Sequence, residues 1–351
     1  MRRVAVPSPA SRVGVSSVAL ITRSTIYPSG VFRHEGSSNP SPRRRAPYTA
    51  EVGSFTDLLG ASPVVLDGGL GTLLDARGYD ASGHLWSARV LREEPDAIAS
   101  AHDAFFAAGA RIATSASYQV SSDGFLRAGL SETEAARALG TSVRLARESA
   151  ERAGTGHVVA ASVGPYGATL ADGSEYHGRY GRTVAELEAW HRPRIERLWA
   201  AGPDVLAIET IPSLAEAEAV ARALDGTGAV AWLSVTVAGG VTRSGDSLHD
   251  VFSVADETPE IAATGVNCCA PIEVTTALRA VAHATRKPAV VYPNSGEEWD
   301  AKNRRWMGSP ALPSDLLAEW LNEGAALIGG CCRVAPEHIA TIADTVRRPR
   351  P

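Results

Sequence analysis

The sequence predicts an α/β fold and, within that class, a (β/α)8 barrel of the TIM type. From about residue 51 onward, short apolar runs alternate with longer stretches of helical periodicity. Strands that alternate with helices imply a parallel sheet, and eight such units in roughly 290 residues fit a closed barrel. An open doubly wound sheet is the alternative. It usually carries a phosphate loop, G-x-G-x-x-G, after its first strand, but the corresponding turn here, Asp67-Gly-Gly-Leu-Gly-Thr72, has a different spacing.

Each predicted strand is a short apolar run that ends in a polar or glycine-containing stretch. The predicted strands lie at residues 63–67, 111–115, 157–162, 205–209, 230–237, 264–267, 289–292 and 325–328. The predicted helices carry apolar residues three or four positions apart, which form one buried face. They lie at residues 85–108 with a restart at Pro95, 132–152, 184–201, 214–224, 248–262 (helical or mixed), 272–285, 313–323 and 336–346.

Composition and charge exclude several functional classes. The chain has 351 residues and is 44% hydrophobic, which supports a sizeable core. A net charge of −5 gives no general case for binding nucleic acid or a membrane surface, and no apolar run reaches the roughly 18 residues of a transmembrane helix. Four cysteines in a chain of this length favour a reducing compartment, so the predicted location is the cytoplasm.

Residues 1–50 differ from the rest of the chain. They contain many serines and prolines, the cluster Arg43-Arg44-Arg45 and a single acidic residue, Glu35. No helix or strand period persists, which predicts a disordered basic extension, followed by a barrel domain over residues 51–351. A targeting peptide is a second interpretation, because such leaders are rich in arginine and serine and poor in acids. A misassigned start is a third.

Polar and sulfur-containing residues follow most of the predicted strands. In a barrel of this type, the chemistry takes place at the carboxyl ends of the strands, so these residues are expected to face one mouth. They are Asp67, Ser115, Tyr118, Tyr166, Glu209, Thr210, Asn267, Cys268, Asn294, Cys331 and Cys332.

The four cysteines form two adjacent pairs, each just after a predicted strand. Cys331 and Cys332 can aim at one point only if the backbone leaves strand geometry, which Gly329-Gly330 permits. Together with Cys268 they would offer three thiolates to one zinc ion and leave its fourth position open, the pattern of a catalytic zinc site. A substrate thiol in that position would lose its proton at neutral pH.

Other interpretations of the cysteines are a set of small buried hydrophobes or a redox switch between the two vicinal cysteines. Cys269 is expected to point away from Cys268 and not to be a ligand. Histidine ligands are not expected, because the sequence contains neither H-x-H nor H-E-x-x-H.

Asp67 and Glu209 end two strands in apolar surroundings. A buried carboxylate without a partner is costly, so an α-ammonium group of a ligand would be a natural partner for either. The alternative is structural: Asp67-Gly68 would form a turn, and Glu209 would place a charge near the start of a helix.

Three motifs resemble the homocysteine S-methyltransferase family. They are Asp-Gly-Gly-x-Gly-Thr at 67–72, Gly-x-Asn-Cys at 265–268 and Gly-Gly-Cys-Cys at 329–332, and the resemblance extends over about residues 63–342. Three further segments, at 164–168, 170–176 and 292–297, resemble the branch of the family that uses S-methylmethionine or S-adenosylmethionine. They are less similar to the betaine-using and cobalamin-dependent branches.

This resemblance implies a zinc-dependent enzyme that transfers a methyl group to the thiolate of homocysteine and yields methionine. Carried over by motif, Cys268, Cys331 and Cys332 would bind Zn²⁺, and Asp67 and Glu209 would hold the homocysteine amino group. Asn267 is a further candidate for substrate binding.

The leaving group argues for a sulfonium donor, because a sulfonium departs as a neutral thioether. Its positive charge favours an aromatic and acidic wall, and S-methylmethionine is the predicted donor. The candidate side chains for this wall are Tyr118, Glu175, Tyr176, Tyr292, Glu297 and Trp299. The alternatives to this function are a betaine-type donor, a thiol redox protein and a zinc-binding barrel without catalytic activity.

Overall fold

The computed structural model describes residues 55–60, 63–79, 87–300, 305–308 and 313–348. Within this part of the chain, eight strands form one parallel sheet in the order β1-β12-β9-β8-β5-β4-β3-β2. The strands are β1 (Val64–Val65), β2 (Ile112–Thr114), β3 (Val158–Val163), β4 (Val205–Ile211), β5 (Ala231–Val235), β8 (Ile261–Asn267), β9 (Ala289–Tyr292) and β12 (Ala325–Ile328). The predicted extension over residues 1–50 lies outside the described residues.

The sheet closes on itself between its two end strands, β1 and β2. Leu66, directly after β1, pairs with Ile112 of β2 in a parallel bridge. The Asp67 amide donates to the Ile112 carbonyl at 3.1 Å, and the Arg111 amide donates to the Val65 carbonyl at 2.8 Å. Because β1 also pairs with β12, the ring is complete. The prediction of a (β/α)8 barrel is confirmed, and the open doubly wound sheet is excluded.

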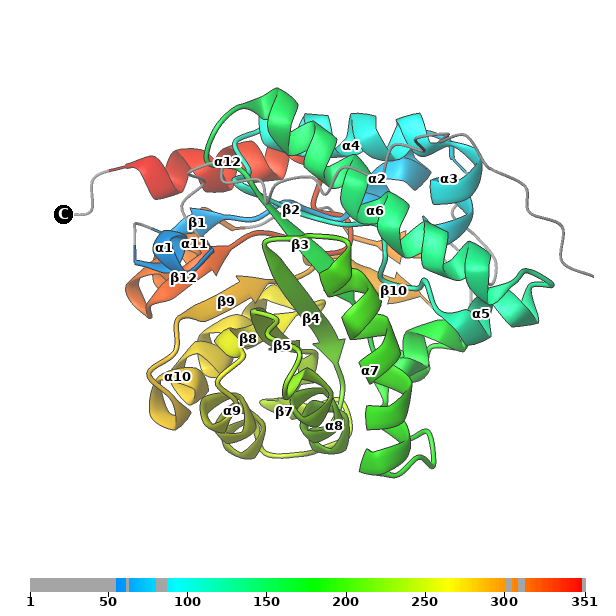
Figure 1. Ribbon diagram of the computed structural model, residues 1–351. Helices are drawn as coiled ribbons and strands as arrows, with labels where there is room; N and C mark the ends of the chain where they lie inside the picture. The colour runs from blue at the N-terminus through cyan, green and yellow to red at the C-terminus, as the bar shows by residue number, and fades with distance from the viewer. Residues whose placement is uncertain (1–54, 61–62, 80–86, 301–304, 309–312, 349–351) are drawn as a thin grey trace, which may run out of the picture. The chain divides into compact units, whose positions relative to one another are not determined.

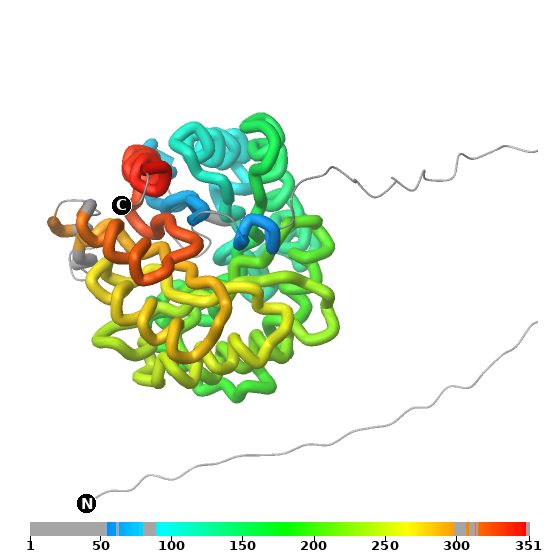
Figure 2. Tube along the Cα trace, turned by 90° about the vertical axis from the view of Figure 1, so that its left-hand side faces the viewer, coloured from blue at the N-terminus to red at the C-terminus, as the bar shows by residue number. Residues whose placement is uncertain are grey.

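A helix follows each barrel strand along the chain, and the helices surround the sheet (Figure 1). In Figure 2 the colour runs round the ring from cyan through green and yellow to red, and red α12 lies against the early helix α4. None of the helices in the described ranges is both long and apolar enough to cross a membrane. The outer helices are α4 (Pro95–Ala107), α6 (Glu132–Ala153), α7 (Val184–Ala200), α8 (Leu214–Leu224), α9 (Leu248–Glu257), α10 (Val274–Ala284), α11 (Ser314–Asn322) and α12 (Pro336–Arg347).

Some predicted boundaries differ from the structure, and several short elements were not predicted. The stretch predicted as helical or mixed over residues 248–262 is helical only as far as Glu257, because Pro259 disfavours helical geometry at Thr258. Strand β8 begins at Ile261, before the strand predicted at residues 264–267. The predicted restart at Pro95 is confirmed, since α3 (Ser87–Glu93) ends just before α4. The elements that were not predicted are α1 (Phe55–Leu59), α2 (Leu70–Ala76), α5 (Ser122–Arg127), β6 (Val237–Ala238), β7 (Val241–Thr242), β10 (Glu298–Asp300), β11 (Arg305–Met307), η1 (Tyr166–Thr169), η2 (Ser174–Tyr176) and η3 (Pro271–Glu273).

Alternating side chains along the strands build two separate apolar cores. In β3, Val158 and Ala160 face the barrel interior, whereas Val159 and Ala161 face the outer helices, as the two-residue period of a strand requires. The interior is filled largely by Trp232, whose ring lies 5.8 Å from that of Phe55 in α1. The apolar side chains fill the barrel interior, and polar side chains lie at the carboxyl ends of the strands.

The backbone of β8 approaches β9 so closely at Gly265 that no side chain fits there. A Cβ atom at this position would overlap the carbonyl oxygen of Val290, which cannot move without breaking the sheet. We expect Gly265→Ala to destabilise the fold by more than about 3 kcal/mol, measured as a large fall in melting temperature. The matched control is Gly140→Ala in α6, where an added Cβ meets nothing within 4 Å; it should be neutral or stabilising by up to about 1 kcal/mol. Equal melting temperatures for the two variants would contradict this account.

Candidate metal centre and active site

Three of the four cysteines come together at the carboxyl ends of two barrel strands. Cys268 follows β8, and Cys331 and Cys332 follow β12. Their sulfur atoms all lie within 4.8 Å of one another, and the sulfurs of Cys268 and Cys332 are 3.8 Å apart. The Cys269 side chain lies instead in the outer apolar core, where burial raises the pKa of its thiol.

The two vicinal cysteines reach one point because the chain leaves the sheet after Ile328. The Gly330 amide donates to the Asp67 carbonyl at 3.0 Å, and the Cys331 amide donates to the Pro293 carbonyl at 2.8 Å. The Cys332 amide donates to the side-chain oxygen of Asn294 at 3.1 Å. The backbone amides of both cysteines therefore bond to the loop after β9, instead of continuing the hydrogen bonds between β12 and β9.

The paired glycines of the two motifs serve close packing. Gly69 touches the loop of the vicinal cysteines, because a Cβ there would overlap the Cys331 carbonyl oxygen. A Cβ at Gly330 would overlap the side chain of Val334 in the same way. The glycine pairs after β1 and β12 thus bring the Asp67 motif into direct contact with the cysteine motif.

Left-handed backbone geometry marks the ends of three barrel strands. Thr210 of β4, Cys268 after β8 and Arg333 after β12 have φ angles of 61°, 50° and 67°. Residues other than glycine adopt this geometry at a cost of roughly 1–3 kcal/mol each, and such positions cluster at functional sites. At Thr210 it accompanies a break in the register between β4 and β5, which re-aims the neighbouring Glu209 side chain.

Asp67 and Glu209 are buried carboxyl groups without an ion-pair partner among the described residues. Asp67 is 4% exposed and Glu209 is 7% exposed. The oxygens of Asp67 accept hydrogen bonds from the Thr114 amide at 2.7 Å and from its hydroxyl at 2.9 Å, and Glu209 accepts one from the Ser162 hydroxyl.

Burial raises the pKa of both groups, to about 8 for Asp67 and to about 7 for Glu209. The charge of Glu209 contributes to the raised pKa of Asp67, so the two groups are neighbours. Two buried carboxyl groups that lack an ion-pair partner in the described part of the chain are suited to a cationic ligand.

The Asn267 side chain is used within the protein. Its oxygen accepts a hydrogen bond from the Thr210 amide at 2.7 Å, and its amide group donates to the Thr210 hydroxyl at 2.8 Å. Asn267 therefore holds Thr210 in its left-handed conformation, next to Glu209. Its role in contacting substrate stays a prediction.

Three of the predicted donor-binding residues gather around the sulfur cluster. The Tyr176 hydroxyl lies 3.3 Å from the Cys268 sulfur. Burial raises the pKa of the Tyr118 phenol, and the neighbouring charges of Glu175 and Cys268 raise it further. Burial also raises the pKa of Glu175 to about 7, and one of its carboxyl oxygens is buried without a hydrogen-bond partner. Trp299 lies in β10, but its side chain is outside the described part of the structure.

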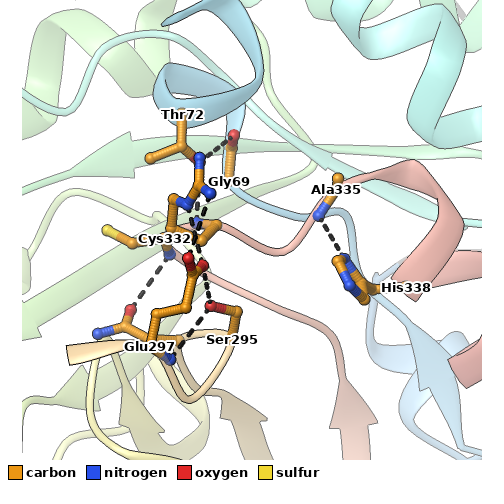
Figure 3. A network of polar contacts seen from close by, with 9 residues as sticks. Gly69, Thr72, Ser295, Glu297, Cys332, Ala335 and His338 are labelled. Atoms are coloured by element: carbon orange, nitrogen blue, oxygen red, sulfur yellow. Dashed lines mark hydrogen bonds and ion pairs between the residues drawn. The ribbon is translucent and has the colours of Figure 1, made fainter. Parts of the chain in front are cut away.

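Two further donor candidates have partners within the protein. The Tyr292 hydroxyl accepts a hydrogen bond from the Trp232 indole at 2.9 Å. The Glu297 carboxylate forms an ion pair with Arg333, at 2.9 Å, and also accepts a hydrogen bond from Ser295. Figure 3 shows the contacts of Glu297 and Ser295 beside Cys332.

Arg333 was missed in the sequence, although it directly follows the cysteine motif. Its amide donates to the Thr72 hydroxyl at 2.9 Å, and that hydroxyl donates to the Gly69 carbonyl at 3.0 Å. Together with its ion pair to Glu297, these bonds tie the loops after β1, β9 and β12 together around Cys332 (Figure 3).

Arg194 of α7 is a second positioning residue that sequence patterns did not reveal. It is 4% exposed, and its guanidinium donates to the carbonyls of Gly164, Ser117 and Tyr118 at 2.8, 2.8 and 2.6 Å. Arg194 thereby joins the loops after β2 and β3 and fixes the backbone of Tyr118. A buried arginine inside a helical pattern gives no local signal of which loops it will reach.

The three thiols fit a zinc ion. Tetrahedral Zn–S bonds of about 2.3 Å place two sulfur atoms roughly 3.8 Å apart, which agrees with the 3.8 Å between Cys268 and Cys332. Three thiolates also leave one coordination position for a further ligand. The described residues contain no other group of three or more histidine, cysteine or acidic side chains placed to hold a metal.

Comparison with known proteins relates this chain to one family. The family described as "Homocysteine S-methyltransferase" matches residues 64–346. The homocysteine S-methyltransferase of Escherichia coli is 44% identical over 291 residues, which are 80% of this chain and 94% of that protein. The homocysteine S-methyltransferase YbgG of Bacillus subtilis is 42% identical over 297 residues, covering 81% of this chain and 94% of the relative.

A solved structure agrees with these matches. The metallated form of the homocysteine methyltransferase MmuM from Escherichia coli superposes with a TM-score of 0.73 at 41% identity, and covers 81% of this chain and 96% of its own. The shared fold agrees with the family match. So does the position of the sequence motifs of this chain, whose backbones meet around three cysteines. The chain belongs to the homocysteine S-methyltransferase family, as its sequence motifs predicted.

Proposed function

We propose that this protein is a zinc-dependent enzyme that moves a methyl group from S-methylmethionine to homocysteine. The observation that carries the proposal is the placement of three converging thiols beside two buried, unpaired carboxyl groups, at the mouth of a barrel of this family. The thiols are suited to a metal and the carboxyl groups to an ammonium. Homocysteine carries both a thiol and an ammonium group.

In this proposal, Cys268, Cys331 and Cys332 hold zinc, which when bound lowers the pKa of a substrate thiol so that it reacts as a thiolate at neutral pH. Asp67 and Glu209 bind the homocysteine α-ammonium and orient its sulfur towards the donor. Asn267 keeps the backbone beside Glu209 in place. The site residues, the barrel domain over residues 51–351 and a cytoplasmic location are part of the same proposal.

The transfer itself needs no further co-reactant. The homocysteine sulfur forms a bond to the donor methyl carbon, and the bond from that carbon to the sulfonium sulfur breaks. The electron pair stays on the leaving sulfur, which departs as a neutral thioether, and the thiol proton passes to solvent. With S-methylmethionine as donor, both products are methionine.

The donor assignment predicts a ranking of methyl donors. A cationic sulfonium suits the aromatic rings of Tyr118 and Tyr176, and the acidic Glu175 beside them suits a positively charged donor. Methionine formation from homocysteine by the purified protein should be fastest with S-methylmethionine, slower with S-adenosylmethionine and far slower with betaine. The zinc content of the same preparation should be about one per chain. Fastest turnover with betaine would contradict the donor assignment, and a zinc-free, redox-active protein would support the thiol redox alternative.

A further inference from the structure

Arg243 is a cation at the sulfur cluster that has no anionic partner among the described residues. It follows β7, in the segment that leaves the barrel after β5, and its amide donates to the Thr236 carbonyl at 3.2 Å. Its guanidinium lies over the ring of Tyr176, 5.4 Å from the ring centroid, and the hydroxyl of the same tyrosine is 3.3 Å from the Cys268 sulfur. Arg243 and the proposed metal ligand Cys268 therefore contact the same tyrosine, Tyr176.

Stacking on Tyr176 leaves the hydrogen-bonding capacity of Arg243 unused. A guanidinium carries five N–H donors, and its contact with the Tyr176 ring pairs none of them with an oxygen acceptor. The Nε atom of Arg243 is buried and has no hydrogen-bond partner among the residues that the structure describes. A guanidinium that lies over an aromatic ring and has a donor without a partner among the described residues is suited to a carboxylate.

Glu175 supplies a carboxyl group directly before Tyr176, the residue whose ring Arg243 contacts. Its Oε2 atom is buried, and no donor to it is found in the described ranges of the chain. The loop is fixed by a left-handed Gly173 and by a hydrogen bond of 2.9 Å from the Ser174 amide to Asp172. Glu175 and Arg243 do not form an ion pair with each other, so both remain available to a ligand.

We propose that Arg243 and Glu175 bind the amino-acid head of the methyl donor. The donor α-carboxylate pairs with the Arg243 guanidinium, and its α-ammonium pairs with Glu175. This inference rests on the proposed function and deepens it, because it defines the donor class as sulfonium compounds with a zwitterionic amino-acid head. Asp67 and Glu209 are more completely buried than Arg243 and Glu175 and remain assigned to homocysteine.

The test compares three sulfonium donors that carry different charged groups; dimethylsulfoniopropionate also has one carbon fewer than S-methylmethionine between its sulfur and its carboxylate. S-methylmethionine carries a carboxylate and an ammonium, dimethylsulfoniopropionate carries a carboxylate alone, and trimethylsulfonium carries neither. Because a hydrogen bond to a charged group contributes about 1.5–3 kcal/mol, Arg243→Gln should raise the KM for the first two donors roughly ten- to a hundredfold. The kcat/KM for trimethylsulfonium and the KM for homocysteine should stay unchanged.

Glu175→Gln separates the two halves of the proposal. It should raise the KM for S-methylmethionine by a similar factor and leave dimethylsulfoniopropionate much less affected. Equal weakening of all three donors would mean that Glu175 pairs with the sulfonium charge, and would overturn its assignment to the ammonium.

Direct binding provides a measurement that does not depend on turnover. Calorimetric titration with S-methylmethionine, without homocysteine, should show the same loss of affinity in Arg243→Gln, whereas Arg243→Lys should lose less because it keeps the charge. The matched control is Arg179→Gln, which removes an exposed cation from the same loop region and should change neither binding nor turnover. Melting temperatures check that each variant is folded.

Two outcomes would overturn the assignment in distinguishable ways. Unchanged S-methylmethionine binding in a folded Arg243→Gln variant would overturn the role of Arg243 and leave the proposed function intact. A wild-type protein that methylates homocysteine only from donors without an amino-acid head would overturn the proposed donor together with this site.

Discussion

Replacing Cys268, Cys331 or Cys332 by alanine is expected to remove zinc and abolish methionine formation. The three sulfur atoms lie within 4.8 Å of one another, so each would supply one of only three protein ligands. Loss of an outer-sphere partner already costs 10–100-fold in metal affinity or activity, and loss of a ligand should exceed about 100-fold. Zinc content by atomic spectroscopy and methionine formation would both be measured for each variant.

Cys269→Ala is the matched control for these variants. It removes a thiol from the adjacent position, but this side chain lies in the outer apolar core. We expect it to retain zinc and activity and to lose about 1 kcal/mol of stability. Loss of zinc in Cys269→Ala, or its retention in Cys331→Ala, would show that the ligand set is wrong.

The second large effect is expected for Asp67→Asn and Glu209→Gln, which keep the shape of each side chain and remove its charge. Each variant should bind homocysteine roughly ten- to a hundredfold more weakly, because a hydrogen bond between charged groups contributes about 1.5–3 kcal/mol. The zinc content should stay the same. Unchanged homocysteine affinity in both variants would favour the structural interpretation of the two carboxyl groups.

The raised pKa values give this prediction a pH dependence. Burial raises the pKa of Asp67 to about 8 and that of Glu209 to about 7, so both groups are largely protonated below pH 7 and cannot pair with an ammonium. The affinity for methionine, a ligand with the same ammonium and no thiol, should therefore rise between about pH 6 and pH 8. Asp67→Asn should flatten this profile at its upper end.

The same groups make the free protein less stable at high pH. A carboxyl whose pKa is higher in the folded state than in the unfolded state binds more protons when folded, so its contribution to stability is lost as the pH rises from about 4 towards 8. Asp67→Asn removes the buried charge and should melt at an equal or higher temperature than the wild type at pH 8. A variant that loses both homocysteine binding and stability at pH 8 would contradict a ligand-binding role.

Prediction from the sequence was most accurate where apolar residues recur with the period of a strand or a helix. The run Val205–Ile208 and the helix after it were located correctly, because strand and helix periods are local properties. The helix boundary near Thr258 was placed too late, since a single proline outweighed the apolar pattern. The hairpin of β6 and β7 was missed, because its two strands are too short to show a period.

The sequence by itself determined the barrel, the family and the position of the cysteines after two strands. Each of these follows from short-range patterns: alternation of strands and helices, three motifs, and glycine pairs beside cysteines.

Only the tertiary structure decided which polar groups meet at the mouth of the barrel. It paired Arg333 with Glu297, fixed Tyr118 through Arg194, and engaged Asn267 with Thr210. Within the described part of the chain, it also left Arg243 Nε and Glu175 Oε2 without hydrogen-bond partners, on either side of Tyr176 in the contacts described above. These relations depend on closure of the sheet, which brings the ends of strands distant in the sequence to one face, and no local pattern encodes which side chains then come within hydrogen-bonding distance.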